Sequence, residues 1–463
     1  MPFKKLFSRY SRQDIALIAV VIGSAVAILD GSIVNLALPK IEAEWHSGYS
    51  SLQWISDAYL LSLSSLILLG GSLGDIFGRK KTYLIGVAGF GVTSLLCALA
   101  PSVEVLVGMR ILQGVFGALL VPGALSIINT MFTSGSARSQ AIGKWTAWSS
   151  IAVVISPFLG GWILAVASWR WIFFINIPLI IGCYLLAQFA VKETKDSRSR
   201  RVDPFGAIFG ALSLAGVTYG LIEGPARHWT FWEIGALIAG GVLFGVFLLW
   251  EKHHRDPMVK LSLFESKNFT GANLMTFLMY GALGGFTFAF VIYLQTHLHY
   301  SAFEAGLSLL PISVFLMLFS GRVGKLSAVY GPRLFMTAGP IVAGAGMGLL
   351  YFLRPGDSYL LGVLPGVVLF SIGMTLLVSP LTTTVMAAVQ KDDSGIASGV
   401  NNAVARSAGL IVIAALGLLG ASSAYSFALG LCASMAVLSG VVSFIFIEKP
   451  YKTPPADEVS TIA

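Results

Sequence analysis

The chain has 463 residues, of which 56% are hydrophobic and only 11% are charged. Ordinary soluble domains contain about 25% charged residues, so a soluble enzyme is excluded. The mean hydropathy of +0.81 extends along the whole chain, which also excludes a soluble domain held by one membrane anchor. We therefore expect an all-α integral membrane protein that crosses the bilayer repeatedly.

Apolar stretches long enough to cross the membrane divide the chain. A crossing helix needs about 20 apolar residues, and the Gly, Pro and charged clusters separate fourteen such stretches, in the order six, two, six. The predicted spans are 15–39, 50–74, 82–100, 103–130, 141–166, 170–191, 204–223, 232–250, 268–294, 304–325, 332–353, 358–387, 395–418 and 422–447.

These spans predict four segments along the chain. The segments are an N-terminal six-helix bundle (1–191), a linker with two additional transmembrane helices (192–267), a C-terminal six-helix bundle (268–447) and a tail (448–463).

The distribution of Lys and Arg predicts the orientation of the chain. An even number of crossings places both termini on one side, and cytoplasmic loops are enriched in Lys and Arg. Most of the 30 Lys and Arg residues fall on the side of the termini, whereas the opposite loops hold only Lys40, Arg170, Arg227 and Arg354. We expect both termini in the cytoplasm and the protein in the plasma membrane. The net charge of +8 then reflects topology, and no nucleic-acid partner is expected.

The N-terminal basic stretch and the apolar run after it are not interpreted as a secretory signal. The run is longer than a signal peptide requires, has no small-residue cleavage site at the right distance and contains Asp30.

Three charged residues are predicted to share one depth in the outer half of the membrane. Counting 1.5 Å per residue from the outer helix ends places Asp30 roughly 13 Å deep, Asp57 roughly 10 Å deep and Arg110 roughly 12 Å deep. They come from three different helices, so a clustered site explains their placement more simply than three independent coincidences. Ionisable groups within spanning helices are costly and point to function.

This cluster has two interpretations. In the structural one, Arg110 simply neutralises one aspartate. In the other, two acids and one base leave one carboxylate without a permanent partner, and a low dielectric with a like charge nearby favours its protonated form. Such a group can carry a proton, and its protonation can switch a bistable structure.

The remaining ionisable and reactive side chains of the predicted helices give weaker indications of function. Arg406 has no acid on the flanking helices, so contact with lipid headgroups or carbonyls is preferred to a substrate role. The six histidines lie in or beside loops, and Cys97, Cys183 and Cys432 lie in apolar stretches, where they are interpreted as packing residues. We expect no metal site and no cofactor.

The segment 71–84 lies between the second and third predicted helices on the cytoplasmic side. Its glycines allow two helices to approach, and Asp75 can interact with an arginine or a helix N-terminus. The spacing of Gly71, Asp75, Gly78, Arg79 and Lys80 resembles the signature loop of the major facilitator superfamily. The resemblance implies a conformational switch in this loop.

Further motifs resemble the fourteen-helix drug:proton antiporters of that superfamily. The segment 106–117, with Arg110 and Gln113, is similar to the fourth-helix motif, in which the arginine is associated with proton coupling. Segments 29–39 and 169–178 also resemble this branch. So does Gln53-Trp54 with Asp57 and Tyr59, a pattern similar to exporters of quaternary ammonium compounds and dyes. The resemblance implies proton coupling at Asp30, Asp57 and Arg110.

The fifth predicted helix bears on the direction of transport. Exporters of the superfamily have glycines and a Gly-Pro pair here, and this chain has Gly143, Ala152, Ser156-Pro157 and Gly160-Gly161 at those places. Two glycines are replaced by small residues, so close helix packing and a proline kink are retained. An antiporter-type helix is implied, although any kinked helix of small residues would have a similar sequence.

The second half departs further from the family pattern. The segment 321–333 resembles a degenerate signature loop with Ala328 in place of an acid, and the last six predicted helices hold no central carboxylate. Proton coupling would then rest on the first half. Polar residues expected to line a central cavity are Asn35, Trp54, Tyr59, Gln113, Asn401, Asn402 and Arg406.

The resemblance predicts two pseudo-symmetric six-helix bundles that open a central cavity alternately to either side. Protons entering through Asp30 and Asp57 would drive export of an amphipathic, cationic compound held by aromatic and Met side chains. The expected partners are a small-molecule substrate, protons and the lipid bilayer, and the protein is expected to be a monomer, by analogy with the superfamily.

Several alternatives remain open. An uptake symporter could use the same fold and acids, and the substrate could be a lipid or a neutral or anionic metabolite. An enzyme is not expected, because no nucleophile with a base, metal cluster or phosphate-binding loop is present. A channel is disfavoured by the lack of rings of charged or carbonyl groups.

Overall fold

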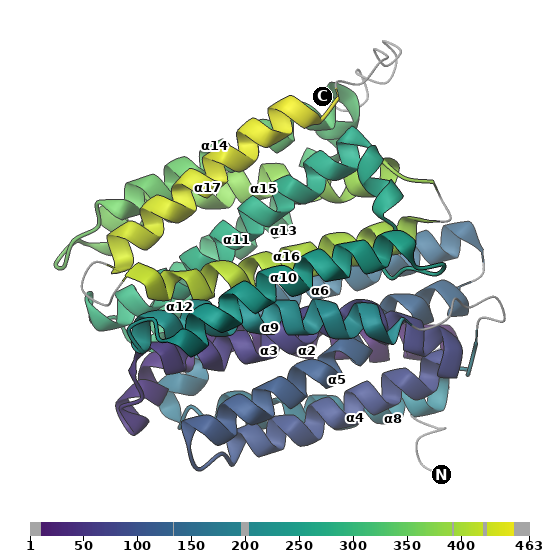
Figure 1. The fold of residues 1–463 in the computed structure, drawn as a ribbon, viewed down its shortest axis with the longest axis horizontal. Coiled ribbons are helices and arrows are strands. Elements are labelled where there is room, and N and C mark those ends of the chain that lie inside the picture. Colours follow the sequence, from purple (N-terminus) through teal and green to yellow (C-terminus); the bar gives the residue numbers. More distant parts are fainter. Residues whose placement is uncertain (1–10, 133, 196–202, 391–392, 420–423, 449–463) are drawn as a thin grey trace. The chain divides into compact units, whose positions relative to one another are not determined.

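The computed structural model describes residues 11–132, 134–195, 203–390, 393–419 and 424–448, and these ranges contain helices and no strands. The first helices are α2 (Arg12–Trp45), α3 (Gly48–Phe77), α4 (Arg79–Ala98), α5 (Val103–Met131), α6 (Gly135–Val166), α7 (Trp171–Phe174), α8 (Asn176–Ala190), α9 (Pro204–Ala226) and α10 (Phe231–His253). They are followed by η1 (Leu261–Glu265), α11 (Lys267–Thr296), α12 (Ala302–Ser308), α13 (Leu310–Tyr330), α14 (Pro332–Tyr351), η2 (Tyr359–Val363), α15 (Leu364–Ala387), α16 (Ser394–Leu416), η4 (Gly417–Leu419) and α17 (Ala424–Phe446) (Figure 1).

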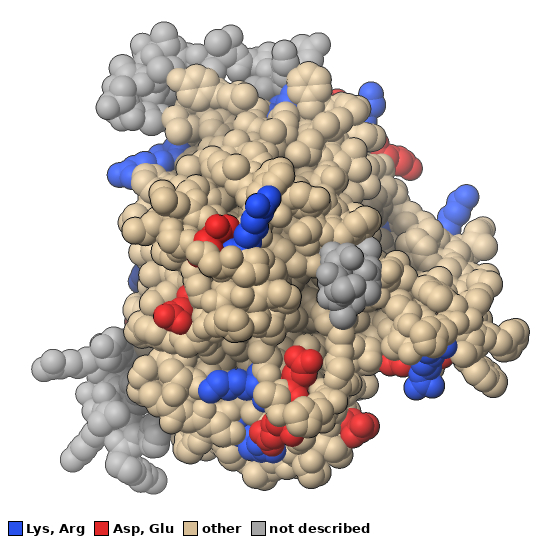
Figure 2. All heavy atoms as spheres, turned by 90° about the vertical axis from the view of Figure 1, so that its left-hand side faces the viewer, with Lys and Arg blue, Asp and Glu red and all other residues tan. Residues whose placement is uncertain are grey.

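Thirteen spans in the described residues are long and apolar enough to cross a membrane, and α6 adds the shorter apolar stretch Ile155–Val166. Together they confirm the predicted set of fourteen crossings. Figure 2 looks onto the ends of the helices, where several Lys, Arg, Asp and Glu side chains lie scattered among uncharged ones. The predicted tail lies outside the described residues except for Glu448.

Two predicted crossings are each built from two α-helices. The expected span 304–325 is formed by α12 and α13, which are separated at Leu309, just before Pro311. Proline has no backbone N–H and tolerates only the first turn of a helix, which accounts for a break at this place. The expected span 170–191 is similarly divided into α7 and α8.

Several helices extend beyond their predicted spans. α2 covers residues 12–45, whereas hydropathy predicted 15–39. The difference arises because hydropathy detects only the apolar part of a helix, while capping side chains decide where the helix begins. Ser11 accepts a hydrogen bond from the Asp14 N–H, and the Asp14 carboxylate accepts one from the Ser11 N–H.

The helices form two compact units. The first comprises Met1–Met258 with Tyr300–Leu307, and the second comprises Val259–His299 with Ser308–Ala463, as far as these ranges are described. In the first unit α3 and α4 pack on α5, and α2 packs on α6 and α8. The additional helices α9 and α10 pack on each other, and α9 also packs on α3, so they belong to the first unit. In the second unit α14 packs on α15 and α17, and α11 packs on α16 and α17.

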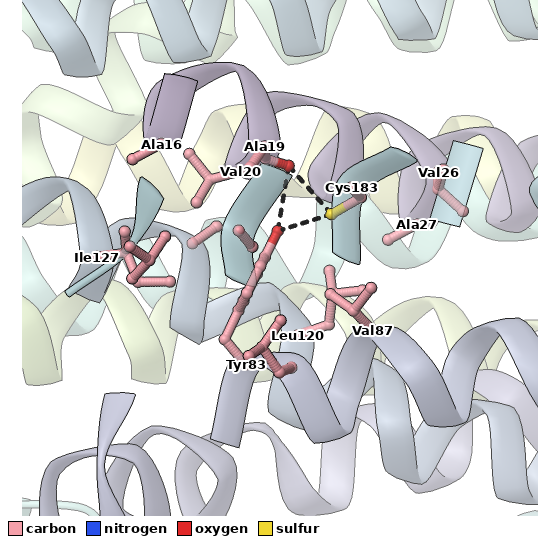
Figure 3. Close-up of a cluster of buried hydrophobic side chains, with 14 of the residues drawn as sticks. Ala16, Ala19, Val20, Val26, Ala27, Tyr83, Val87, Leu120, Ile127 and Cys183 are labelled. Atoms are coloured by element: carbon pink, nitrogen blue, oxygen red, sulfur yellow. Dashed lines mark hydrogen bonds between the residues drawn. The ribbon is translucent and has the colours of Figure 1, made fainter. Parts of the chain in front are cut away.

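The core of the first unit contains a small polar contact among apolar side chains. Tyr83 on α4 is fully buried, and its hydroxyl donates a hydrogen bond to the Ala19 carbonyl of α2 at 3.3 Å (Figure 3). Cys183 on α8 donates its thiol to the same carbonyl at 3.2 Å. Each buried polar group thus has a partner, which avoids the cost of leaving it unsatisfied, and three helices are joined at one point.

Candidate functional site

A buried ion pair lies at the centre of the first unit. Asp30 on α2 and Arg110 on α5 are 2% and 1% exposed, and Arg110 Nη1 lies 2.5 Å from Asp30 Oδ2. The other oxygen, Asp30 Oδ1, accepts a hydrogen bond from Gln113 Nε2 at 3.0 Å. Gln113 also accepts a hydrogen bond from Arg110 through its Oε1 at 2.7 Å. The two opposite charges and the amide between them therefore form one closed network.

Two further helices complete this network. Asn176, at the start of α8, donates its amide to Asp30 Oδ1 at 3.0 Å, and Ser94 on α4 accepts a hydrogen bond from Gln113 Nε2 at 2.9 Å. Asp30 thus accepts hydrogen bonds through both oxygens, as a buried carboxylate requires if it is to stay charged.

The guanidinium of Arg110 also has contacts outside the ion pair. Its Nε donates to the Ile55 carbonyl of α3 at 3.2 Å. Its guanidinium carbon lies 4.5 Å from the ring centroid of Tyr59, which is itself buried. A cation over an aromatic face is stabilised by the ring quadrupole. Arg110 therefore joins α2, α3 and α5, and Tyr59 belongs to this site.

Asp57 on α3 is arranged differently. It is completely buried, and neither of its carboxylate oxygens has a hydrogen-bond partner within the described residues. It forms no ion pair with Arg110 in those residues, although Ile55, two positions earlier, accepts a hydrogen bond from that arginine. The predicted cluster of three charges is therefore resolved into an Asp30–Arg110 pair and a separate, unpartnered acid.

Near Asp57, the neutral polar residues pair with each other. Ser56 donates its hydroxyl to the Asn35 side-chain oxygen at 2.9 Å, which joins α3 to α2. Asn35 is half-buried, so it remains partly accessible.

Trp54 faces the additional helices. Its indole Nε1 donates to Glu223 Oε1 of α9 at 2.7 Å, and its ring centroid lies 6.5 Å from that of Tyr219 on the same helix. The other oxygen of Glu223 pairs with Arg227 at 2.8 Å. α9 is thereby attached to α3 one helical turn before Asp57.

The signature loop joins the C-terminal end of α3 to the N-terminal end of α4. Asp75 and Arg79 form an ion pair at 2.8 Å, across one helical turn and the break at Gly78. Gly78 has φ +117°, a conformation that L side chains rarely adopt, so glycine is required there. Glu193, beyond α8, accepts hydrogen bonds from the backbone N–H groups of Lys80 and Lys81 at 3.1 and 3.0 Å. A carboxylate at a helix N-terminus satisfies free N–H groups and complements the helix dipole.

Directly before this loop, Gly70 on α3 makes a close helix contact. A Cβ atom at Gly70 would lie 1.9 Å from the Ala118 carbonyl oxygen of α5, whereas one at Gly71 would meet only Pro122 at 3.8 Å. The close approach of α3 to α5 therefore depends on Gly70, while Gly71 has room for a small side chain.

The residues of the antiporter-type motif lie on α6 but have different surroundings. A Cβ atom at Gly160 would lie 2.8 Å from Ile33 of α2, and one at Gly161 would lie 2.6 Å from the Phe303 backbone. Ser156 is buried, and the carbonyl oxygen of Pro157 would lie 2.3 Å from a Cβ atom on Gly306. Gly143, by contrast, has open space around it. Close packing is thus confined to the second half of the motif.

The polar candidates of the second unit lie on α16. Asn401 donates its amide to Asn273 Oδ1 at 3.2 Å and to Thr276 Oγ1 at 2.9 Å, both on α11. Asn402 donates to the Ser398 carbonyl of its own helix at 3.0 Å, and Arg406 is half-buried one turn further along. The structure brings Asn401 and Asn402 to one cavity.

Four residues of these arrangements had no role assigned from sequence: Ser94, Asn176, Glu193 and Glu223. Asn176 falls within the motif 169–178, and an amide side chain within an apolar span is a signal that could have singled it out. Glu223 lies near the end of an apolar span and could have been singled out as a charge in the membrane. Nothing in the sequence distinguishes Ser94 from other small helix residues. Within the described residues, no group of three or more His, Cys, Asp or Glu side chains could hold a metal ion.

A family model for the Major Facilitator Superfamily matches residues 20–414. The chain belongs to this superfamily. It is 33% identical to "Multidrug resistance protein Stp" of Mycobacterium tuberculosis over 88% of this chain and 75% of that protein. It is 29% identical to "Puromycin resistance protein pur8" of Streptomyces alboniger (96% and 93% covered), and 32% identical to "Methylenomycin A resistance protein" of Bacillus subtilis (87% and 86% covered).

Solved structures show the same fold at low identity. The inward-open xylose transporter XylE from E. coli aligns with TM-score 0.65 and 14% identity over 97% of this chain and 99% of that one. A POT family transporter in complex with 5-aminolevulinic acid aligns with TM-score 0.72 and 12% identity, over 93% and 95% of the two chains. Membership of the superfamily, shown by the family model and the relatives, makes the protein a multi-pass membrane transporter of small molecules and not an enzyme, as the sequence predicted.

Proposed function

We propose that this protein is a proton-coupled antiporter that exports amphipathic, cationic compounds across the plasma membrane. Transport would occur by alternating access, with both termini in the cytoplasm and a monomer as the working unit. The names of the relatives, which refer to multidrug and antibiotic resistance, support export of foreign compounds. Within this chain the proposal rests on one observation, the unpartnered buried carboxylate of Asp57.

The two acids of the first unit would then have different tasks. Asp30 is bound by Arg110, Gln113 and Asn176, so the ion pair can remain charged throughout the cycle. Asp57 has no such compensation, and an ionised carboxylate in a low-dielectric site without a partner is costly. Asp57 would therefore be the group that takes up a proton from outside and releases it to the cytoplasm, while Asp30 keeps Arg110 in place.

The charge balance favours a cationic substrate. When Asp57 loses its proton, the first unit gains one uncompensated negative charge, and a cation is the ligand that such a charge attracts. Reprotonation would remove this attraction and release the cation. Because a single acid changes charge, one proton for each monovalent cation is the expected stoichiometry, rather than the two protons that two equivalent acids would supply.

Proton release from acid-loaded inside-out vesicles tests the proposal. Adding ethidium should raise the internal pH for the wild-type protein, because an exporter moves the dye inward in exchange for protons. Asp57→Asn keeps the shape of the side chain and should abolish this response. Glu104→Gln, a matched change of an exposed acid at the start of α5, should leave it unchanged.

The result can contradict the proposal in two ways. If Asp57→Asn still exchanges protons for ethidium, Asp57 is not the proton carrier. If the folded wild-type protein releases no protons with any cation but accumulates a compound together with protons, it is an uptake symporter, and the proposed direction is wrong.

A further inference from the structure

The second unit contains a small polar cavity. Its volume is about 120 Å³, and its walls come from α11, α15 and α16. This space is large enough for ordered water or for one small functional group of a ligand. The polar lining consists of Tyr280, Thr382, Ser398, Asn401 and Asn402, and no lining residue is charged.

The hydrogen bonds behind this cavity determine how Asn401 is oriented. Asn273 donates its amide to the Phe269 carbonyl, so its own oxygen faces Asn401. Thr276 donates its hydroxyl to the Ala272 carbonyl, so its oxygen can only accept from Asn401. Two acceptors require the NH₂ group of Asn401 between them. Its Oδ1 takes no part in these two bonds and is left as a hydrogen-bond acceptor toward the cavity.

Two neighbouring side chains are restricted in the same way. Asn402 donates one N–H of its NH₂ group to the Ser398 carbonyl, which sets the orientation of the amide and leaves its Oδ1 as an acceptor. Thr382 donates its hydroxyl hydrogen to the Val378 carbonyl, which leaves only its oxygen lone pairs. Three of the five polar lining residues therefore offer an acceptor oxygen, and in Asn401 and Thr382 the donor groups are already engaged.

From this arrangement we propose that the cavity binds a hydrogen-bond donor group of the transported compound, namely the N–H groups of a primary or secondary ammonium. Side-chain carbonyl and hydroxyl oxygens accept hydrogen bonds from such a group without any acidic partner. A quaternary ammonium carries the same charge but no N–H, so it cannot satisfy these acceptors. The inference rests on the proposed transport of cations and adds a preference between two kinds of cation.

Direct binding to the purified, full-length protein tests this preference without a proton gradient. Decylammonium and decyltrimethylammonium, two probes with the same tail and charge, are titrated separately by calorimetry below their micellar concentrations. The wild-type protein should bind decylammonium about tenfold more tightly, which is the effect of one hydrogen bond to a charged group. Asn401→Leu should reduce the two affinities to near equality by weakening the binding of decylammonium alone.

Two matched pairs of variants separate recognition from folding. Thr382→Val keeps the shape and removes an acceptor of the cavity, so it should lower the preference. Thr383→Val makes the same change at the adjacent residue, which is not part of the lining, and should leave the preference unchanged. Asn401→Gln retains an amide with both an NH₂ group and an acceptor oxygen and should keep the preference for decylammonium.

Three outcomes would overturn the inference: equal affinities for the wild-type protein, an undiminished preference in Asn401→Leu, or no binding of either probe. Ethidium-dependent proton release from vesicles is independent of these titrations. If that release persists while the preference is absent, the cavity inference fails and the proposed function remains. If both are absent, the proposed function fails as well.

Discussion

The buried polar clusters of the two units differ in charge. The first unit holds an ion pair, Asp30 with Arg110, and the unpartnered Asp57, whereas the second unit joins Asn401, Asn273 and Thr276 through neutral hydrogen bonds. A charged cluster can respond to protons and to the membrane potential, while a neutral cluster keeps one hydrogen-bonding pattern at every pH of interest. The comparison suggests that one half changes charge during transport and the other half recognises the compound.

Breaking the ion pair should have the largest effect. Arg110→Leu leaves Asp30 buried without its cation, and breaking a buried pair from one side costs about 3–5 kcal/mol. Unfolding can be followed with a thiol-reactive fluorophore, because Cys97, Cys183 and Cys432 are free and buried in the folded protein. We expect a pronounced fall in melting temperature.

The double variant Asp30→Asn with Arg110→Leu provides the control for this pair. It removes both charges, so it should melt well above the Arg110→Leu single variant. If the single and double variants melt together, the carboxylate does not carry a charge that Arg110 must balance, and the contrast between the two clusters is lost.

Breaking the neutral cluster should cost less. Asn273→Leu removes one acceptor of the Asn401 amide, and leaving a buried neutral donor unsatisfied costs about 1–3 kcal/mol. The same thiol assay should show a smaller fall in melting temperature than for Arg110→Leu, and the fall should not depend on pH between 6 and 8. A fall in melting temperature as large as that of Arg110→Leu would mean that charge is not what distinguishes the two units.

The link between α3 and α9 should have the smallest effect on stability. Trp54→Phe keeps an aromatic ring near Tyr219 but loses the hydrogen bond to Glu223, worth about 1 kcal/mol at a partly buried site. Trp232→Phe on α10 is the matched control, because that side chain is 74% exposed and makes no hydrogen bond in the described part of the chain.

The pH dependence of ethidium transport shows whether the link between α3 and α9 matters for Asp57. If α9 positions α3, Trp54→Phe should shift this dependence and Trp232→Phe should not. Identical pH profiles for the two variants would leave α9 and α10 without influence on the proton site.

Sequence reasoning located the charged residues but not their partners. The common depth of Asp30 and Arg110 follows from counting residues along two helices, and the structure places them 2.5 Å apart. The same counting grouped Asp57 with them. Counting gives only the depth of a residue along its helix, whereas the rotation of the helix about its own axis decides which side chains face each other. Asn176 and Ser94 could not be assigned for this reason, since their roles depend on how α8 and α4 pack on α2 and α5.

The number of crossings, the membrane environment and the family motifs were determined by the sequence itself, because hydropathy and motif spacing are properties of short, continuous segments. The tertiary structure decided which acid is paired, which helix holds Trp54 and which oxygen of Asn401 is free. These features depend on contacts between helices far apart in the chain, where a side chain's partner is set by packing and not by its neighbours in sequence.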